Sequence, residues 1–276
     1  MRSLLLALDD TPAGASAMAF AVSLAAAHNA SATGVCILDV DHLTAVEPFA
    51  IGTAYYKFKA DVAHLKRAHE LTDRLFEEFV RQCKARGVRS DILALEGRPS
   101  EELRRAAATH DLVVIGRDSD LHGESSSGLA DTVQQLLLEN PRPVLIAPAT
   151  ARAPVRVVVA YDGSATAARM LQLFALLGLA SKLETHVISI DAAQEAADRH
   201  VAQASAYLGL YDIACGTRAI ASKANPAELV IAEARGLGAD LIAMGAYGRR
   251  GWREALLGSF TTRMLADSPV ALFIHH

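Results

Sequence analysis

Short apolar runs alternate with longer stretches of helical period along the second half of the chain. Residues 155–161 form a valine-rich run of the kind that is buried on both faces of a parallel sheet. The residues after Ser164, which can act as a helix N-cap, then follow a helical period. One face of this predicted helix carries four residues: Ala167, Leu171, Phe174 and Gly178. Further strands are expected at 183–190, 213–221, 240–245 and 270–274, with a long helix at 192–210.

Helix start signals mark the same alternation in both halves. Asn225 is expected as an N-cap, with Pro226 in the first turn and Glu228 placed as in a capping box. The first half has such signals at two places, Thr11-Pro12 and Pro99 with Glu101. Strands that alternate with helices predict a parallel, doubly wound α/β sheet in each half.

The chain contains the same pattern twice. Asp9 follows an apolar run and precedes an alanine-rich helical stretch, as Asp162 does at an offset of 153 residues. Two later pairs match in the same order: Gly116 with Gly245, at an offset of 129, and Pro143 with Pro269, at an offset of 126. Such a series indicates a duplicated domain. The boundary falls near residues 148–155, which are rich in proline and small residues, so we expect a first copy at 1–150 and a second copy at 151–276.

The first copy carries extra residues. The offset falls by 24 between the first two matching pairs, and we place the insertion near residues 41–61. That segment holds four aromatic residues, Phe49, Tyr55, Tyr56 and Phe58. Packing against its own domain is the favoured interpretation, and a lid or a partner surface is the alternative.

Composition and charge narrow the function classes. The 276 residues are 51% hydrophobic and 21% charged, with 27 basic and 31 acidic residues and a net charge of −4. This balance gives no electrostatic reason to expect nucleic acid or an anionic membrane as a partner. No apolar stretch is long enough for a membrane helix, and the N-terminal apolar run is too short for a secretion signal. Three cysteines fit no zinc or disulfide spacing, are expected as buried apolar residues and favour a cytoplasmic protein without a structural metal: Cys36, Cys83 and Cys215.

Two segments of the second copy are expected to meet at the carboxyl ends of its strands, where open parallel sheets bind ligands. One is 162–164, directly after the first strand, and the other is the loop and helix start at 244–261. In the latter, Gly245 and Gly248 permit a close approach of the backbone to a ligand. The pair Gly258-Ser259 then precedes a helical pattern.

Residue types at this place indicate a nucleotide. The helix that starts after Gly258 offers free N–H groups and the positive end of its dipole, which suit a phosphate. Ser259 and Thr261 add hydroxyl donors. Asp162, on the other side, is better placed to accept from a ribose hydroxyl or a base amine than to meet a phosphate, which it would repel. Two basic residues of the loop are considered as phosphate ligands, with solvated loop charges as the favoured alternative: Arg249 and Arg250.

The spacing Gly245-x2-Gly248-x9-Gly258-Ser259 resembles the G-2x-G-9x-G-[S/T] signature of ATP-binding universal stress proteins. The Asp-Gly-Ser after the first strand and the Asn-Pro-Ala-Glu before the fourth are also similar to that family, and the resemblance covers the whole chain as two tandem UspA-like domains. It implies two doubly wound, five-stranded parallel sheets of the adenine nucleotide alpha hydrolase-like type. Their apolar last strands, at 144–147 and 270–274, would pair to form an intramolecular pseudo-dimer.

The same resemblance implies roles for single residues. By position in the motif, Asp162 would contact the adenosine part and Ile188 would offer its backbone to the base. The glycines and hydroxyls of the loop would hold the ribose and phosphates. The candidate set is Asp162, Ser164, Ile188, Gly245, Gly248, Arg249, Gly258, Ser259 and Thr261. The expected ligand is ATP, with ADP, AMP or a cyclic nucleotide as alternatives, and Mg²⁺ would accompany the phosphates.

The first copy keeps Asp9 but departs from the rest of this pattern. Ser119 stands where the second glycine is expected, and Ala130-Asp131 replaces the Gly-Ser pair. Four carboxylates would repel phosphate, so we expect no ATP in this copy: Asp118, Asp120, Glu124 and Asp131. A cation bound by the alternating acidic residues and His122 is an alternative to a solvated acidic loop, which is favoured.

Absent motifs limit the chemistry. The glycine loop contains no lysine that could neutralise a transferring phosphoryl group, and no base is placed to activate water. We therefore expect a regulatory protein that binds a nucleotide and has no catalytic residue, and the resemblance to universal stress proteins implies a role in the stress response. A slow ATPase, an adenylating ligase and a ligand-independent interaction scaffold are the alternatives. The sequence does not identify a protein partner, and two tandem chains could form a homodimer.

Overall fold

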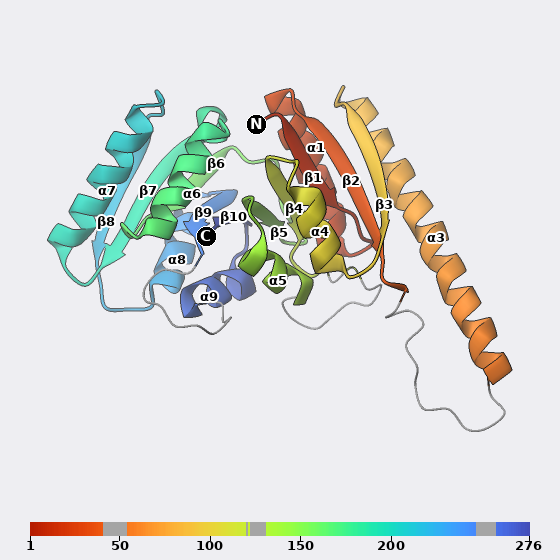
Figure 1. Cartoon of the computed structure of the whole chain (residues 1–276). Coiled ribbons are helices and arrows are strands. Elements are labelled where there is room, and N and C mark those ends of the chain that lie inside the picture. The colour runs from red at the N-terminus through yellow and green to blue at the C-terminus, as the bar shows by residue number, and fades with distance from the viewer. Residues whose placement is uncertain (41–53, 120, 122–130, 247–257) are drawn as a thin grey trace.

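The computed structural model describes residues 1–40, 54–119, 121, 131–246 and 258–276. Within these residues, ten strands form one sheet (Figure 1). The first copy supplies β1 (Ser3–Ala7), β2 (Ser31–Leu38), β3 (Ser90–Glu96), β4 (Leu112–Gly116) and β5 (Val144–Ala147). The second supplies β6 (Arg156–Ala160), β7 (Glu184–Asp191), β8 (Cys215–Ala221), β9 (Leu241–Gly245) and β10 (Ala271–His275). Their order across the sheet is β3-β2-β1-β4-β5-β10-β9-β6-β7-β8.

The two copies meet at their last strands. Pairing within each copy is parallel, whereas β5 and β10 pair antiparallel. The facing residues at this seam are Val144, Leu145 and Ile146 with Ile274, Phe273 and Leu272, and each is at most 2% exposed. Burial of six apolar side chains explains why these strands do not remain free edges. The predicted pairing of two doubly wound sheets as a pseudo-dimer is confirmed.

Helices cover both faces of the sheet (Figure 1). One face carries α1 (Pro12–His28), α3 (Ala54–Ala85), α6 (Ala165–Leu176) and α7 (Gln194–Gly209), together with the short 3₁₀ helix Ala180–Lys182. The other carries α4 (Pro99–Ala107), α5 (Asp131–Glu139), α8 (Pro226–Leu237) and α9 (Ser259–Asp267). The first core layer contains Phe20, Phe79 and Phe174, and the second contains Leu103, Leu136 and Leu265.

Helix starts follow the predicted signals. The side chain of Thr11 accepts from Gly14 N at 2.9 Å, and that of Ser164 accepts from Ala167 N at 3.2 Å. Asn225 Oδ1 accepts from Ala227 N at 3.0 Å. One detail of the predicted helix is wrong: Gly178 does not lie on the buried face of α6. The helix ends at Leu176, and Gly178 has a φ of 72°, a left-handed conformation that suits glycine after a helix end.

A repeated carboxylate ties down the first strand of each copy. Asp111 Oδ2 accepts from the backbone N–H groups of Arg2 at 2.6 Å and Ser3 at 3.1 Å. Asp240 Oδ2 accepts in the same way from Val155 at 3.0 Å and Arg156 at 3.2 Å. Both aspartates precede the fourth strand of their copy, so the duplication extends to individual hydrogen bonds.

The additional length of the first copy is partly helical. Helix α3 has 32 residues, whereas its counterpart α7 has 16. It runs beside β3 and continues past the end of the strand (Figure 1). Most of the insertion predicted at 41–61, including Phe49, lies outside the described residues.

The three cysteine side chains differ in burial. Cys36 and Cys83 are buried, and burial raises the pKa of Cys36 to about 12 and that of Cys83 to about 11. Cys215 is only half-buried, so the expectation of a buried side chain is wrong there.

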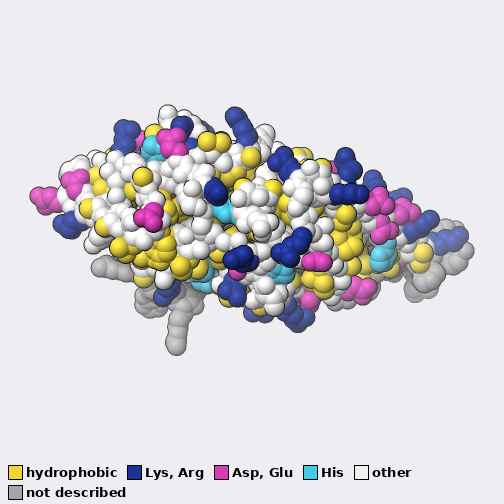
Figure 2. All heavy atoms as spheres, turned by 90° about the horizontal axis from the view of Figure 1, so that it is seen from above, with side chains coloured by type: hydrophobic (Ala, Val, Ile, Leu, Met, Phe, Trp, Pro, Cys, Tyr) yellow, Lys and Arg dark blue, Asp and Glu magenta, His cyan; other side chains and the backbone are white. Residues whose placement is uncertain are grey.

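Among the described helices, none is long and apolar enough to cross a bilayer. Figure 2 shows basic and acidic side chains interspersed over one face.

Candidate functional site

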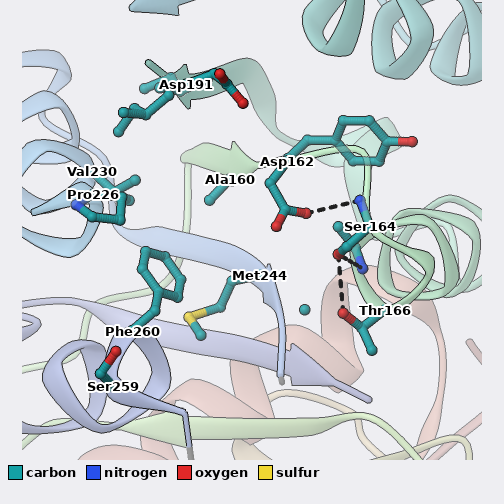
Figure 3. A pocket seen from close by; sticks show the side chains of 15 residues that line it. Ala160, Asp162, Ser164, Thr166, Asp191, Pro226, Val230, Met244, Ser259 and Phe260 are labelled. Atoms are coloured by element: carbon teal, nitrogen blue, oxygen red, sulfur yellow. Dashed lines mark hydrogen bonds between the residues drawn. The ribbon is translucent and has the colours of Figure 1, made fainter. Parts of the chain in front are cut away.

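A cavity of about 310 Å³ opens at the carboxyl ends of β6, β7 and β9 in the second copy. The starts of α6, α8 and α9 surround it (Figure 3). Its apolar walls come from Ile188, Ile190, Pro226, Val230, Met244 and Phe260. Its polar lining comes from Asp162, Ser164, Thr166, Asp191 and Ser259. This is the edge of the sheet at which the sequence predicts a ligand.

The turn after β6 presents a carboxylate to the cavity. Asp162 is exposed, and its Oδ1 accepts from Ser164 N at 3.0 Å. Ser164 Oγ in turn caps α6 and lies 3.1 Å from Thr166 Oγ1. Both Asp162 and Ser164 face the cavity (Figure 3). The turn is therefore held by its own hydrogen bonds while the carboxylate stays accessible to a ligand.

The side chain of His200, on α7, packs against this turn, a contact not predicted from the sequence. Gly163 has a φ of 74°, and a Cβ there would lie 2.7 Å from Cδ2 and Nε2 of His200. His200 Nδ1 lies 3.2 Å from the hydroxyl of Ser189, a residue that is 1% exposed. The ring thus fills the space beside Gly163 and links α7 and β7 to the turn. No local motif signals such a contact between residues far apart in sequence.

Gly245 allows β9 to approach the start of α6. A Cβ at this position would lie 2.7 Å from Ala167 N and 2.8 Å from the carbonyl carbon of Thr166. The neighbouring atoms belong to the backbone and cannot swing aside, so a side chain here would separate the strand from the helix. Gly245 also lines the cavity.

The start of α9 forms another side of the cavity. Gly258 occupies the N-cap position without a side-chain cap, and Ser259 and Phe260 line the cavity. The first N–H groups of a helix lack acceptors within the helix, so they are available to an anion. Thr261, by contrast, is 1% exposed and is not part of the lining.

Five of the predicted residues come together in the cavity lining: Asp162, Ser164, Ile188, Gly245 and Ser259. Gly248 and Arg249 lie outside the described residues. Prediction missed Asp191, whose Oδ1 accepts from Ala193 N at 3.0 Å. Its position directly after a predicted strand was the available signal. The apolar residues Met244 and Phe260 carry no chemical motif, so their place in the lining depends on the fold.

The first copy treats the equivalent aspartate differently. Asp9 Oδ1 accepts from Thr11 N at 3.0 Å and from its hydroxyl at 2.7 Å, while Oδ2 is buried without a hydrogen bond of ordinary geometry to any described residue. Burial raises the pKa of the Asp9 carboxyl, and the nearby Ser119 hydroxyl and the Thr11 donors oppose that shift. Ser119 is fully buried against Gly116, where a Cβ would lie 2.5 Å from its Oγ. The sequence did not predict that this carboxylate is withdrawn from the surface.

The acidic loop of the first copy is described only in part. Asp118 forms an ion pair with Arg117 at 3.6 Å, and Asp131 opens α5. Asp120, His122 and Glu124 lie outside the described residues, so most of the hypothetical cation site does too. Among the described residues, no group of three or more His, Cys, Asp or Glu side chains is arranged to hold a metal.

Comparisons with known proteins identify the family. A model described as the universal stress protein family matches residues 1–148 and 155–276. Universal stress protein Slr1230 from Synechocystis sp. is 23% identical over 162 residues, which cover 58% of this chain and 56% of that relative. The match thus spans little more than half of the relative's length.

Solved structures agree in fold. A universal stress protein from Archaeoglobus fulgidus DSM 4304 superposes with a TM-score of 0.73 at 17% identity, covering 99% of this chain and 97% of that chain. A putative universal stress protein from Pseudomonas aeruginosa UCBPP-PA14 has a TM-score of 0.60 at 16% identity, covering 100% and 93%. Because the family model matches both copies and leaves only a short linker between them, the chain belongs to the universal stress protein family.

Proposed function

We propose that the second copy, 151–276, binds an adenine nucleotide, with ATP as the foremost ligand, and that the protein acts as a regulatory binding module. The observation that carries this proposal is the cavity itself. It combines apolar walls, an accessible carboxylate and an uncapped helix start within one space of about 310 Å³. A nucleotide offers the three matching chemistries: an aromatic base, ribose hydroxyls and phosphates.

The arrangement of the lining favours one orientation of the ligand. Ile188, Val230 and Met244 provide apolar surface for the base. Asp162 is an acceptor for ribose hydroxyls and repels phosphate, so the phosphates belong at the opposite side, near Ser259 and the first turn of α9. Mg²⁺ would accompany them. Gly248, Arg249 and Thr261 remain part of the proposed loop on the strength of the motif.

Fast phosphoryl transfer is not favoured. Among the described residues that line the cavity, none is Lys, Arg or His. Phosphoryl transfer needs positive charge to stabilise the equatorial oxygens and a group that orients the nucleophile. The two carboxylates, Asp162 and Asp191, supply neither positive charge nor a metal site on their own. A slow ATPase is the second candidate, and a ligand-independent scaffold is the third.

Titration calorimetry with ATP and nucleotide-stripped protein tests the proposal. We expect one ATP per chain, because Asp9 of the first copy is half-buried with its Oδ2 inaccessible, and because that copy has an acidic loop. Gly258→Val is expected to abolish binding, since a side chain at the helix start blocks close approach of a phosphate. A Cβ at Gly258 meets no atom of the described residues within 4 Å, so the described part of the fold should tolerate the change.

Gly236→Val, on α8, is the matched control, because a Cβ there likewise meets no atom within 4 Å in the part of the chain that the structure describes. Two ATP per chain would contradict the proposed difference between the copies. No binding by the wild-type chain would overturn the nucleotide proposal and favour the scaffold.

A further inference from the structure

In each copy, a backbone carbonyl shortly before the last strand accepts a side-chain hydrogen bond, but the donor differs between the copies. Arg142 and Ser268 are equivalent, because each directly precedes a proline of the repeat. Arg142 O accepts from Asn140 Nδ2 at 2.8 Å, within the first copy. Ser268 O accepts from Arg117 Nη1 at 3.0 Å, and Arg117 belongs to the other copy.

The antiparallel seam explains how Arg117 reaches this carbonyl. Its backbone N–H donates to Ala147 O at 2.8 Å, which places the residue at the end of β5. Since β5 and β10 run in opposite directions, the end of β5 lies beside the start of β10, which begins at Ala271, three residues after Ser268. The Arg117 side chain is 25% exposed, so the contact is partly shielded from water.

The second copy makes no equivalent side-chain contact with the first copy at the corresponding residue. The counterpart of Arg117 in the second copy is Ala246, whose N–H donates to His275 O at 2.8 Å in the same manner. A methyl group has no donor, so Ala246 cannot bond the carbonyl of Arg142. The first copy therefore holds an element of the second, without the reverse contact at the equivalent place.

The hydrogen bond from Arg117 to Ser268 O lies at the C-terminal end of α9. Ser268 is its C-cap, and its own last turn contains no basic residue. A guanidinium at that end complements the negative end of the helix dipole and satisfies a terminal carbonyl. The opposite end of this nine-residue helix lines the cavity through Ser259 and Phe260. A short helix moves largely as a rigid unit, so a shift at Ser268 changes the position of the N–H groups at the cavity.

We propose that Arg117 of the first copy is a positioning residue for the nucleotide site of the second copy, acting through the C-terminal end of α9. This inference rests on the proposed nucleotide binding. It gives the first copy a role in a site to which it contributes no lining residue among those described.

Arg117→Ala tests the inference, with Arg142→Ala as the matched control. Arg142 Nη2 donates to Ala108 O at 2.9 Å, and Ala108 is the C-cap of α4, so the control removes the same type of bond from a helix far from the cavity. Calorimetry with ATP should show affinity reduced about fivefold in Arg117→Ala and unchanged in Arg142→Ala. Arg117→Lys, which keeps a charged donor, should restore part of the loss.

Amide hydrogen exchange of ligand-free protein supplies a readout that does not depend on ATP. We expect faster exchange along α9 in Arg117→Ala and unchanged exchange there in Arg142→Ala. Equal ATP affinity in wild type and Arg117→Ala would overturn the inference while leaving the proposed function intact. Equal losses in both variants would overturn it as well, because a general loss of stability would then explain them. If wild type binds no ATP, the proposed function fails, and the inference fails with it.

Discussion

Asp9 and Asp162 hold the same place in the two copies, yet Asp9 is half-buried with its Oδ2 inaccessible, whereas Asp162 is exposed and faces a cavity. Both follow the first strand of their copy, and both accept from the backbone N–H two residues later, at 3.0 Å. The difference lies in what surrounds each carboxylate. The comparison teaches that a repeated residue keeps its local hydrogen bond while its neighbours decide whether it serves the fold or a ligand.

One residue on the helix that follows each aspartate explains why the two carboxylates differ in accessibility. Gly14 in α1 is the counterpart of Ala167 in α6, at the same offset of 153. A Cβ on Gly14 would lie 1.8 Å from Asp9 Oδ1, so the carboxylate occupies space that only a glycine leaves free. In the second copy the methyl group of Ala167 fills that space. Asp162 therefore remains at the surface of the turn, where a ligand can reach it.

Among tests of this comparison, the largest expected effect comes from neutralising the two aspartates in turn. Asp162→Asn should weaken ATP binding about tenfold to a hundredfold, because a hydrogen bond to a charged acceptor is worth about 1.5–3 kcal/mol. Asp9→Asn should leave ATP affinity unchanged, since that carboxylate is withdrawn from the surface. Calorimetric titration of both variants gives the comparison directly. Similar losses in the two variants would show that the copies do not differ in the way proposed.

A smaller effect should follow when the space beside Asp162 is opened. Ala167→Gly gives the carboxylate the room that Asp9 has, so we expect ATP affinity to fall about three- to tenfold as Asp162 withdraws. The variant also loses about 1 kcal/mol of unfolding free energy through helix propensity. Ala168→Gly, at the exposed neighbouring position, carries the same propensity cost without opening that space. Affinity that falls equally in both variants would contradict the steric explanation.

The smallest effect concerns pH. Burial raises the pKa of Asp9 above the ordinary value of 3.8, so the folded state binds a proton more tightly than the unfolded state. The contribution of this group to stability is therefore fully present below the unfolded pKa and is lost as pH rises through the folded pKa. Urea unfolding between pH 3.5 and 7 should show wild type losing stability relative to Asp9→Asn over that window. A constant difference between the two proteins would contradict a raised pKa.

Much of the fold follows from local signals. The caps at Thr11, Ser164 and Asn225 and the apolar runs of the strands depend on neighbouring residues, so the sequence alone was sufficient to predict them. The seam between β5 and β10 could also be predicted, because two apolar last strands need partners and the family resemblance implies that they pair with each other. Gly178 was placed wrongly, since helical periodicity does not contain the point at which the helix ends.

Only part of the site could be predicted from the sequence, because several of its contacts join residues that are far apart in the chain. Asp162 and Gly245 belong to motifs, whereas Phe260 and Met244 line the cavity because the fold directs them there. His200 meets Gly163 across more than thirty residues of sequence, and Arg117 meets Ser268 across the seam. Gly14 was visible in the sequence, but its meaning depends on the side-chain conformation of Asp9. Contacts between distant residues require the assembled sheet before they can be recognised.

Joining the copies in one chain has a consequence beyond the continuity of the sheet. Two separate chains would need sufficient concentration to form the seam between β5 and β10, whereas the tether supplies a high effective concentration at any dilution. Two identical chains related by a two-fold axis would also present the same residue on both sides. The tandem chain is free of that constraint, so Arg117 can face one way across the seam while Ala246 faces the other. Covalent linkage thus permits one half to support and the other half to bind.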